Sequence, residues 1–196
     1  MERRSFVAAG VAAGAAALTV GQPLAASIRG ADPVFSVKFA PHFGMFAGNA
    51  GDDVVAQLRW MHERGFRALE DNGMRGRPVE EQERIGREMA KLGMTMGVFV
   101  LNPGTAFGKI TFAGGDEGFT ESFLADVRAS IEVAKRVNAK WITVVMGEVA
   151  PRLEFEYQTA NGVEVLRKAA ALLEPHGLIM VLEPLNFRDH PNLFLT

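Results

Sequence analysis

Acidic side chains stand directly after several apolar segments of this sequence, and one segment shows the pattern most clearly. Residues 179–187 read IMVLEPLNF, so four apolar residues lead straight into Glu183 with no polar transition. A carboxylate that follows a buried segment so closely is costly unless it has a partner or performs chemistry. We therefore interpret Glu183 as a candidate catalytic residue.

Three other carboxylates have comparable positions. Glu70 and Asp71 end one apolar segment, and Glu148 ends another. If these segments are parallel strands, their carboxyl ends meet on one face, and the acids converge with Glu183. Such a cluster needs an offsetting cation, and oxygen donors without thiolates favour Mg²⁺ or Mn²⁺. Structural roles stay open, because Glu70 and Asp71 can cap the following turn and Glu148 can be a solvated loop residue.

Two histidines and one long connection belong to the same predicted face. His42 and His190 each follow an expected strand, so either one can orient a substrate oxygen or act as a ligand. The connection 102–120 is long and glycine-rich, and its isolated Phe107 and Phe112 are typical of a flap that excludes water from a substrate. A simple surface insertion is the alternative interpretation.

The fold that would position these side chains is indicated by short apolar segments alternating with helical patterns over residues 34–196. The expected strands are 35–40, 66–72, 94–102, 141–148 and 178–186. They recur every 30 to 45 residues or so, about the length of a βα unit with a right-handed crossover. The first is not followed by G-x-G-x-x-G, which disfavours a dinucleotide-binding sheet and favours a (β/α)₈ TIM barrel.

A complete barrel of this class needs eight strands and about 250 residues. We therefore expect an α/β fold that is a partial TIM barrel of about five βα units, truncated at its C-terminus. Its helices have recognisable ends: Asp52 or Asp53 can cap the first, Pro78 suits the first turn of the second, Gly93 stops that helix, and Thr120 precedes the third.

The N-terminal residues 1–27 differ in kind from the rest. Arg3 and Arg4 precede the uncharged Ala/Gly/Val-rich run 6–20, a pattern typical of a twin-arginine signal peptide. The run is too short and too weakly apolar for a stable membrane span, which usually needs about 20 strongly apolar residues. We expect removal after one of residues 25–27 and export to the periplasm. An alanine-rich tail without a signal function is the alternative.

Bulk composition excludes several classes of function. Apolar residues make up 48% of the chain and its formal net charge is only −2. The basic residues alternate with acids along helical patterns, so we expect no nucleic-acid partner. The sequence has no cysteine, which rules out disulfides, thiol catalysis and cysteine-ligated iron–sulfur clusters.

Several stretches of the chain also resemble a known family, over a region that runs from about residue 35 to the end. They are FRALEDN, VLNPGT, VVMGE, EPHGLIMVLEPLN and DHPNLFLT. These stretches resemble the first part of hydroxypyruvate isomerase-type proteins, which belong to the xylose isomerase-like TIM barrel group. The EPLN stretch and the DHP tail carry most of the resemblance.

The resemblance implies a divalent metal, Mg²⁺ or Mn²⁺, at the barrel mouth, and a hydroxy carbonyl or sugar substrate that isomerises through a metal-stabilised enediolate. Of the four metal ligands in such proteins, only the first maps onto this chain, at Glu183, which also implies a proton-transfer role. Glu70 and His190 would line the substrate pocket. With the other ligands outside the sequence, we expect weak or absent metal binding and little isomerase activity from this chain.

Two other functions stay open. An endonuclease-like metal hydrolase has the same type of barrel, although basic clustering is missing here. A non-catalytic module that holds a carbohydrate on the carboxylate-lined face is the second. Exposed sheet edges in an unclosed barrel also favour self-association.

Overall fold

The computed structural model describes residues 35–105 and 107–195. The predicted signal peptide lies outside the described residues. The elements, in chain order, are α1 (Ala47–Ala50), α2 (Val54–Glu63), β1 (Ala68–Leu69), η1 (Met74–Gly76), α3 (Val79–Leu92), β2 (Thr95–Met96), η2 (Phe112–Gly114), α4 (Glu117–Val137), β3 (Trp141–Val144), α5 (Phe155–Leu173), η3 (Glu174–His176) and β4 (Ile179–Leu182).

The strands form one parallel series in sequence order. β1 pairs with β2 and β3 pairs with β4, both in parallel. A parallel bridge between Val100 and Thr143 joins the two pairs, and another joins His42 to Glu70, the residue directly after β1. A doubly wound sheet reverses its strand order, whereas a TIM barrel does not. The structure therefore confirms the predicted partial TIM-barrel fold.

The first expected strand, at residues 35–40, is wrong. Phe35, Val37 and Phe39 are 40%, 58% and 53% exposed, and the described residues of this segment form no strand. Strand pairing depends on packing as well as on propensity, and the one ring contact of Phe35 with Phe66, at 5.1 Å between ring centres, leaves the segment largely exposed. The bridge of His42 to Glu70 lies just after the segment. The later strands occur where predicted but are shorter, because their ends continue as extended connections.

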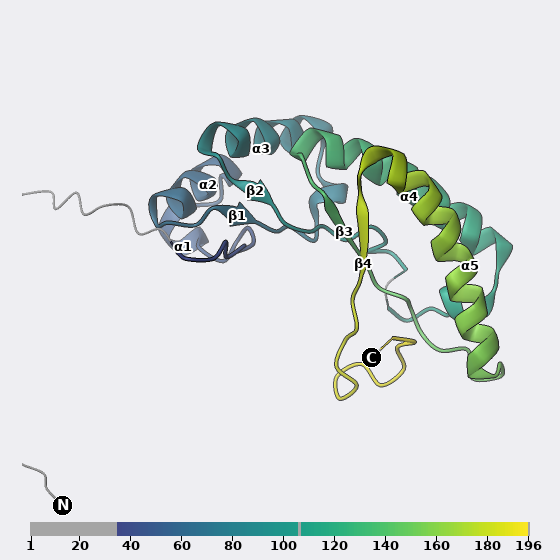
Figure 1. Ribbon diagram of the computed structural model, residues 1–196. Helices are drawn as coiled ribbons and strands as arrows, with labels where there is room; N and C mark the ends of the chain where they lie inside the picture. Colours follow the sequence, from purple (N-terminus) through teal and green to yellow (C-terminus); the bar gives the residue numbers. More distant parts are fainter. Residues whose placement is uncertain (1–34, 106, 196) are drawn as a thin grey trace, which may run out of the picture. The chain divides into compact units, whose positions relative to one another are not determined.

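Helices α3, α4 and α5 follow one another along the strands (Figure 1). Each turns an apolar stripe towards the same core as the strands. The fully buried members of this core include Leu58, Met61, Leu69, Met74, Ile85, Phe99, Leu101, Phe112, Val127, Ile142, Val144 and Ala169. Among the described residues, no helix is both long enough and apolar enough to cross a membrane.

The ends of α2 and α3 follow the capping chemistry expected from the sequence. Asp53 caps α2, and its carboxylate accepts a hydrogen bond of 2.9 Å from the backbone N–H of Ala56. Gly93 stops α3 in the left-handed conformation, at φ 65°. Pro78 is the N-cap residue of α3 rather than a first-turn residue. The helix therefore begins just after Pro78, at Val79.

The start of α4 differs from the prediction that placed it after Thr120. The helix begins at Glu117, because Asp116 caps it by accepting the backbone N–H of Phe119 at 2.5 Å. Thr120 lies inside the first turns, and its hydroxyl donates to the Asp116 carbonyl at 2.9 Å. A second capping residue upstream therefore outcompetes the threonine.

The packing of α3 against α4 depends on one glycine. A β-carbon at Gly86 would lie 2.0 Å from the carbonyl oxygen of Arg136 and 3.3 Å from the α-carbon of Val137. Both are backbone atoms of α4, which cannot move aside as a flexible side chain would. Gly86 thus sets how closely the two helices approach each other.

Candidate functional site

Glu183 lies immediately after β4, at the carboxyl end of the strand series. Its backbone N–H donates to the carbonyl of Val144 at 3.1 Å, which continues the pairing of Leu182 with Val144. The residue is half-buried. Among the described residues its carboxylate has neither a hydrogen-bond nor an ion-pair partner, so the group is available for a ligand.

Glu70 and His42 lie opposite each other at the end of β1. The two residues form a parallel bridge, and the Glu70 N–H donates to the Pro41 carbonyl at 3.1 Å. Residues opposite each other in parallel strands project to the same face, so both side chains share one side of the sheet. Glu70 is half-buried and His42 is exposed.

Asp71 has a structural role, which confirms the turn-capping alternative for this residue. Its carboxylate accepts hydrogen bonds from the Gly73 N–H at 3.1 Å and from Arg77 Nε at 2.5 Å. Burial opposes the charge on Arg77, but hydrogen bonds to Asp71 and Glu81 outweigh it and hold the pKa of the guanidinium above its usual range. The guanidinium also lies 4.8 Å from the ring centre of Phe43.

Glu148, at the carboxyl end of β3, contacts both the connection after β2 and the tail after β4. Its N–H donates to the Lys109 carbonyl at 2.8 Å, and its Oε1 accepts the Gly108 N–H at 3.2 Å. It also bridges to Ile110 in parallel and to Leu193 in antiparallel orientation. The connection after β2 and the tail after β4 are therefore both attached to this residue.

His190 lies in a small cavity beside Glu148. Its ring centre is 5.2 Å from that of Phe107. The cavity has a volume of about 190 Å³ and is lined by Phe107, Glu148, Asp189, His190, Pro191, Asn192 and Leu193. Carboxylates, an imidazole and an aromatic ring suit a ligand with hydroxyl groups and C–H faces. Sequence reasoning did not single out Asp189 or Asn192, although both lie in the DHPNLFLT stretch.

The predicted flap is only partly present. Phe107 is 52% exposed, as a flap residue would be. Phe112 is fully buried, and its ring centre lies 5.0 Å from Phe119 and 4.8 Å from Phe123. The flap role for Phe112 is therefore wrong, because the segment 112–114 folds back as a 3₁₀ turn and packs against α4 and α5.

A complete metal site is not formed by the described residues. They contain no group of three or more His, Asp or Glu side chains placed to hold one ion. Asp71 is held by Arg77, and Glu148 accepts a hydrogen bond from the loop, so neither is directed at a common centre with Glu183. The donor set described here therefore does not fit the divalent metal expected above, and Glu183 as a ligand stays a prediction.

Comparison with known families decides the class of this fold. The family model for the xylose isomerase-like TIM barrel matches residues 58–193. The chain belongs to the xylose isomerase-like TIM barrel family. The matched region includes β1 to β4 and every candidate site residue except His42. No curated protein sequence matches the chain.

Solved structures support the same fold. An AP endonuclease of family 2 from Brucella melitensis superposes with a TM-score of 0.63 at 24% identity, covering 81% of this chain and 59% of its own. D-Psicose 3-epimerase from Clostridium cellulolyticum H10, solved with D-tagatose, gives 0.62 at 13%, covering 80% and 55%. The IolI protein with a bound zinc atom gives 0.60 at 15%, covering 80% and 54%.

These likenesses establish the fold alone, since all three identities are low. The xylose isomerase-like chain described here spans between 54% and 59% of the length of these structures. Activity and substrate are therefore matters for proposal.

Proposed function

We propose that this xylose isomerase-like chain carries the proton-transfer half of an isomerase or epimerase site, with Glu183 as the base. The substrate is a small hydroxy carbonyl compound or sugar, and hydroxypyruvate is the specific candidate that the sequence resemblance suggests. The observation that supports the proposal best is the half-buried Glu183 carboxylate, placed directly after β4 without a partner among the described residues.

The chemistry requires a carboxylate to move one proton. An oxygen of Glu183 removes the proton from the carbon next to the substrate carbonyl, and the electron pair moves onto the carbonyl oxygen to give an enediolate. Return of the proton to the former carbonyl carbon, together with transfer of the other oxygen's hydroxyl proton to the enediolate oxyanion, gives the isomer, whereas protonation of the original carbon from its opposite face gives the epimer. The latter outcome, and efficient turnover in general, need a second acid on the other side of the substrate.

Two neighbouring groups support a substrate-binding role at this end of the strands. Glu70 and His42 share a face at the end of β1, and His190 stacks near Phe107 in the cavity beside Glu148. Hydroxyl groups of a sugar can donate to the carboxylates and accept from an imidazole. We propose Glu70, His42 and His190 as substrate-binding residues on this basis.

Proton exchange tests the proposal more sensitively than turnover does. The full chain is incubated with hydroxypyruvate in D₂O, with added Mn²⁺ and separately with a chelator, and deuterium incorporation is followed by NMR. We expect exchange above the buffer rate in one of the two conditions, with little net isomerisation. Glu183→Gln should slow the exchange at least about 100-fold, the usual scale for loss of a general base.

The matched control is Glu174→Gln, which makes the same chemical change at an exposed residue of η3. It should leave the exchange rate unchanged. Absence of exchange in both conditions, or equal exchange by the Glu183→Gln variant, would contradict the proposal. If hydroxypyruvate or a sugar binds without any exchange, a carbohydrate-binding module becomes the better description.

A further inference from the structure

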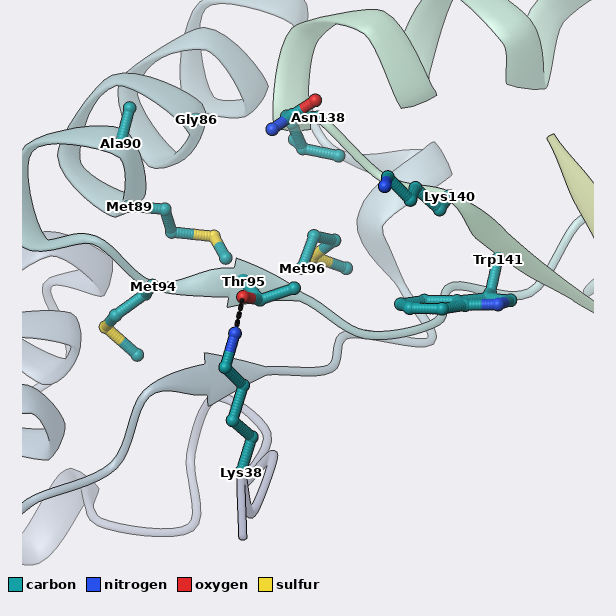
Figure 2. A pocket seen from close by; sticks show the side chains of 11 residues that line it. Lys38, Gly86, Met89, Ala90, Met94, Thr95, Met96, Asn138, Lys140 and Trp141 are labelled. Atoms are coloured by element: carbon teal, nitrogen blue, oxygen red, sulfur yellow. Dashed lines mark hydrogen bonds between the residues drawn. The ribbon is translucent and has the colours of Figure 1, made fainter. Parts of the chain in front are cut away.

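A second and larger cavity lies at the opposite end of the strands from Glu183. Glu183 follows the last pair of the β3–β4 ladder, whereas Trp141 belongs to the first pair. The cavity has a volume of about 380 Å³. It is lined by Lys38, Gly86, Met89, Ala90, Met94, Thr95, Met96, Val137, Asn138, Lys140 and Trp141 (Figure 2).

The charge of this cavity is positive. Lys38 and Lys140 line it, and no acidic residue is among its lining residues. Helices α3 and α4 end nearby, at Gly93 and Asn138. Each helix C-terminus contributes only about half a negative charge, so two lysines more than offset the two helix ends. The excess positive charge favours an anion.

One of the lysines is already held in place. Lys38 Nζ donates to Thr95 Oγ1 at 2.9 Å, drawn as the dashed line in Figure 2. Within the described residues this is the ammonium's one hydrogen bond. Because an ammonium has three donors, two of them can meet a ligand. A side chain that is fixed beforehand loses less entropy when a ligand binds.

Beside the lysines and the polar Thr95 and Asn138, the wall contains apolar side chains and one accessible aromatic ring. Trp141 is 38% exposed, whereas Met89 and Met96 are only 2% and 1% exposed and Met94 is 8% exposed. An exposed indole face is a good surface for a flat apolar group. The cavity thus combines a cationic part with an apolar part.

We propose that this cavity binds a small organic anion, whose charged group meets Lys38 and Lys140 and whose planar apolar body packs on Trp141. The site is separate from the one proposed for isomerisation, and its occupation does not depend on that function.

Phenyl phosphate is a suitable probe, with inorganic phosphate and phenol as its two halves. Isothermal titration calorimetry on the full chain should show saturable binding of phenyl phosphate at one site, at least about tenfold tighter than either half. Lys140→Met should weaken phenyl phosphate about tenfold or more, since a charge-assisted hydrogen bond is lost. Trp141→Ala should bring its affinity close to that of inorganic phosphate.

Lys91→Met is the matched control, because Lys91 is an exposed lysine near the end of α3 that does not line the cavity. It should change the affinity less than twofold, and circular dichroism checks that each variant is folded. The absence of saturable binding would overturn the proposal. Equal weakening by Lys91→Met, or phenol binding as tightly as phenyl phosphate, would overturn it as well.

Discussion

At the scale of single residues, the acids at the strand ends have different roles. Asp71 is 7% exposed and holds Arg77, and Glu148 fastens two loops, while Glu183 and Glu70 carry half-buried carboxylates at the ends of β4 and β1. A carboxylate whose oxygens already accept hydrogen bonds from other groups is less available to a substrate. Glu183 combines available oxygens with a position directly after the apolar strand β4, which supports it as the candidate base.

Asp71→Ala should destabilise the protein by about 2–3 kcal/mol, because it removes a charge-assisted hydrogen bond and the Gly73 contact while Arg77 stays partly buried. Urea unfolding at pH 7 measures the change. Glu83→Ala is the control, since Glu83 pairs with Arg87 at 3.4 Å on the exposed face of α3, and such surface pairs contribute about 0.5 kcal/mol or less. Equal losses in the two variants would refute the structural role of Asp71.

At the scale of the elements, capping residues and close helix packing fix where the helices lie. Asp53 accepts the Ala56 N–H and pairs with Arg84 on α3 at 2.5 Å, so one carboxylate both starts α2 and ties it to its neighbour. Gly86 allows α3 and α4 to approach closely. These local features position the strands whose ends form the candidate site.

Stability should depend on pH through Asp53. The backbone hydrogen bond from Ala56, followed by the contact with Arg84, lowers the pKa of this carboxyl below its ordinary value of 3.8. A lowered pKa means that the stabilisation is present above pH 3.8 and is lost as the pH falls through the folded-state pKa. Asp53→Asn keeps a capping side chain but should flatten the fall of melting temperature between pH 4 and about pH 2.

Asp52→Asn provides the charge-matched comparison for this experiment, because Asp52 is the exposed neighbour that does not cap α2. This substitution should leave the fall of melting temperature at low pH the same as in the parent protein. If both variants reduce the fall of melting temperature at low pH equally, general charge reduction rather than the helix cap explains that reduction.

Gly86→Ala should destabilise the protein by about 2–3 kcal/mol, through overpacking against the α4 backbone. Helix propensity alone would predict the opposite, a gain of about 1 kcal/mol. Gly48→Ala in α1, where a β-carbon meets nothing within 4 Å, is the control and should be neutral or stabilising. Thermal and urea unfolding of both variants distinguish the two effects by their sign.

At the scale of the whole molecule, the parallel strands and the helices that follow them build a xylose isomerase-like barrel segment. The carboxyl ends of its strands carry the proposed isomerase residues, and the amino ends carry the cationic cavity. β4 pairs only with β3 among the described residues, and Ile179 and Val181 on it are 54% and 39% exposed. Self-association of the chain through this exposed strand stays a prediction.

Export is the prediction that concerns the chain as a whole. We propose that the Arg3-Arg4 pattern directs the protein through the twin-arginine pathway. Substituting both residues by lysine should at least halve the periplasmic fraction of the full chain, measured by cell fractionation and immunoblotting. Lysine at Arg87 and Arg128, two exposed arginines outside the predicted signal, should leave it unchanged. Equal periplasmic fractions for all three proteins would contradict the export proposal.

Sequence patterns alone were enough to predict the alternation of helices with the four later strands, two of the helix ends and the placement of acids directly after strands. These features depend on local signals: the apolar period, the capping residues and the glycines that follow helices. Gly93 and Asp53 were predictable for that reason.

Tertiary contacts determine which of the acids are engaged and which remain available. Asp71 is engaged because Arg77 folds back onto it, and Phe112 is core because α4 brings Phe123 against it. Residues 35–40 form no strand, and their apolar side chains stay largely exposed among the described residues. The contacts of Asp71 and Phe112 depend on how the chain turns back on itself, which the apolar period does not specify. Local patterns do not encode such contacts, because burial and ion pairing are properties of the packed molecule.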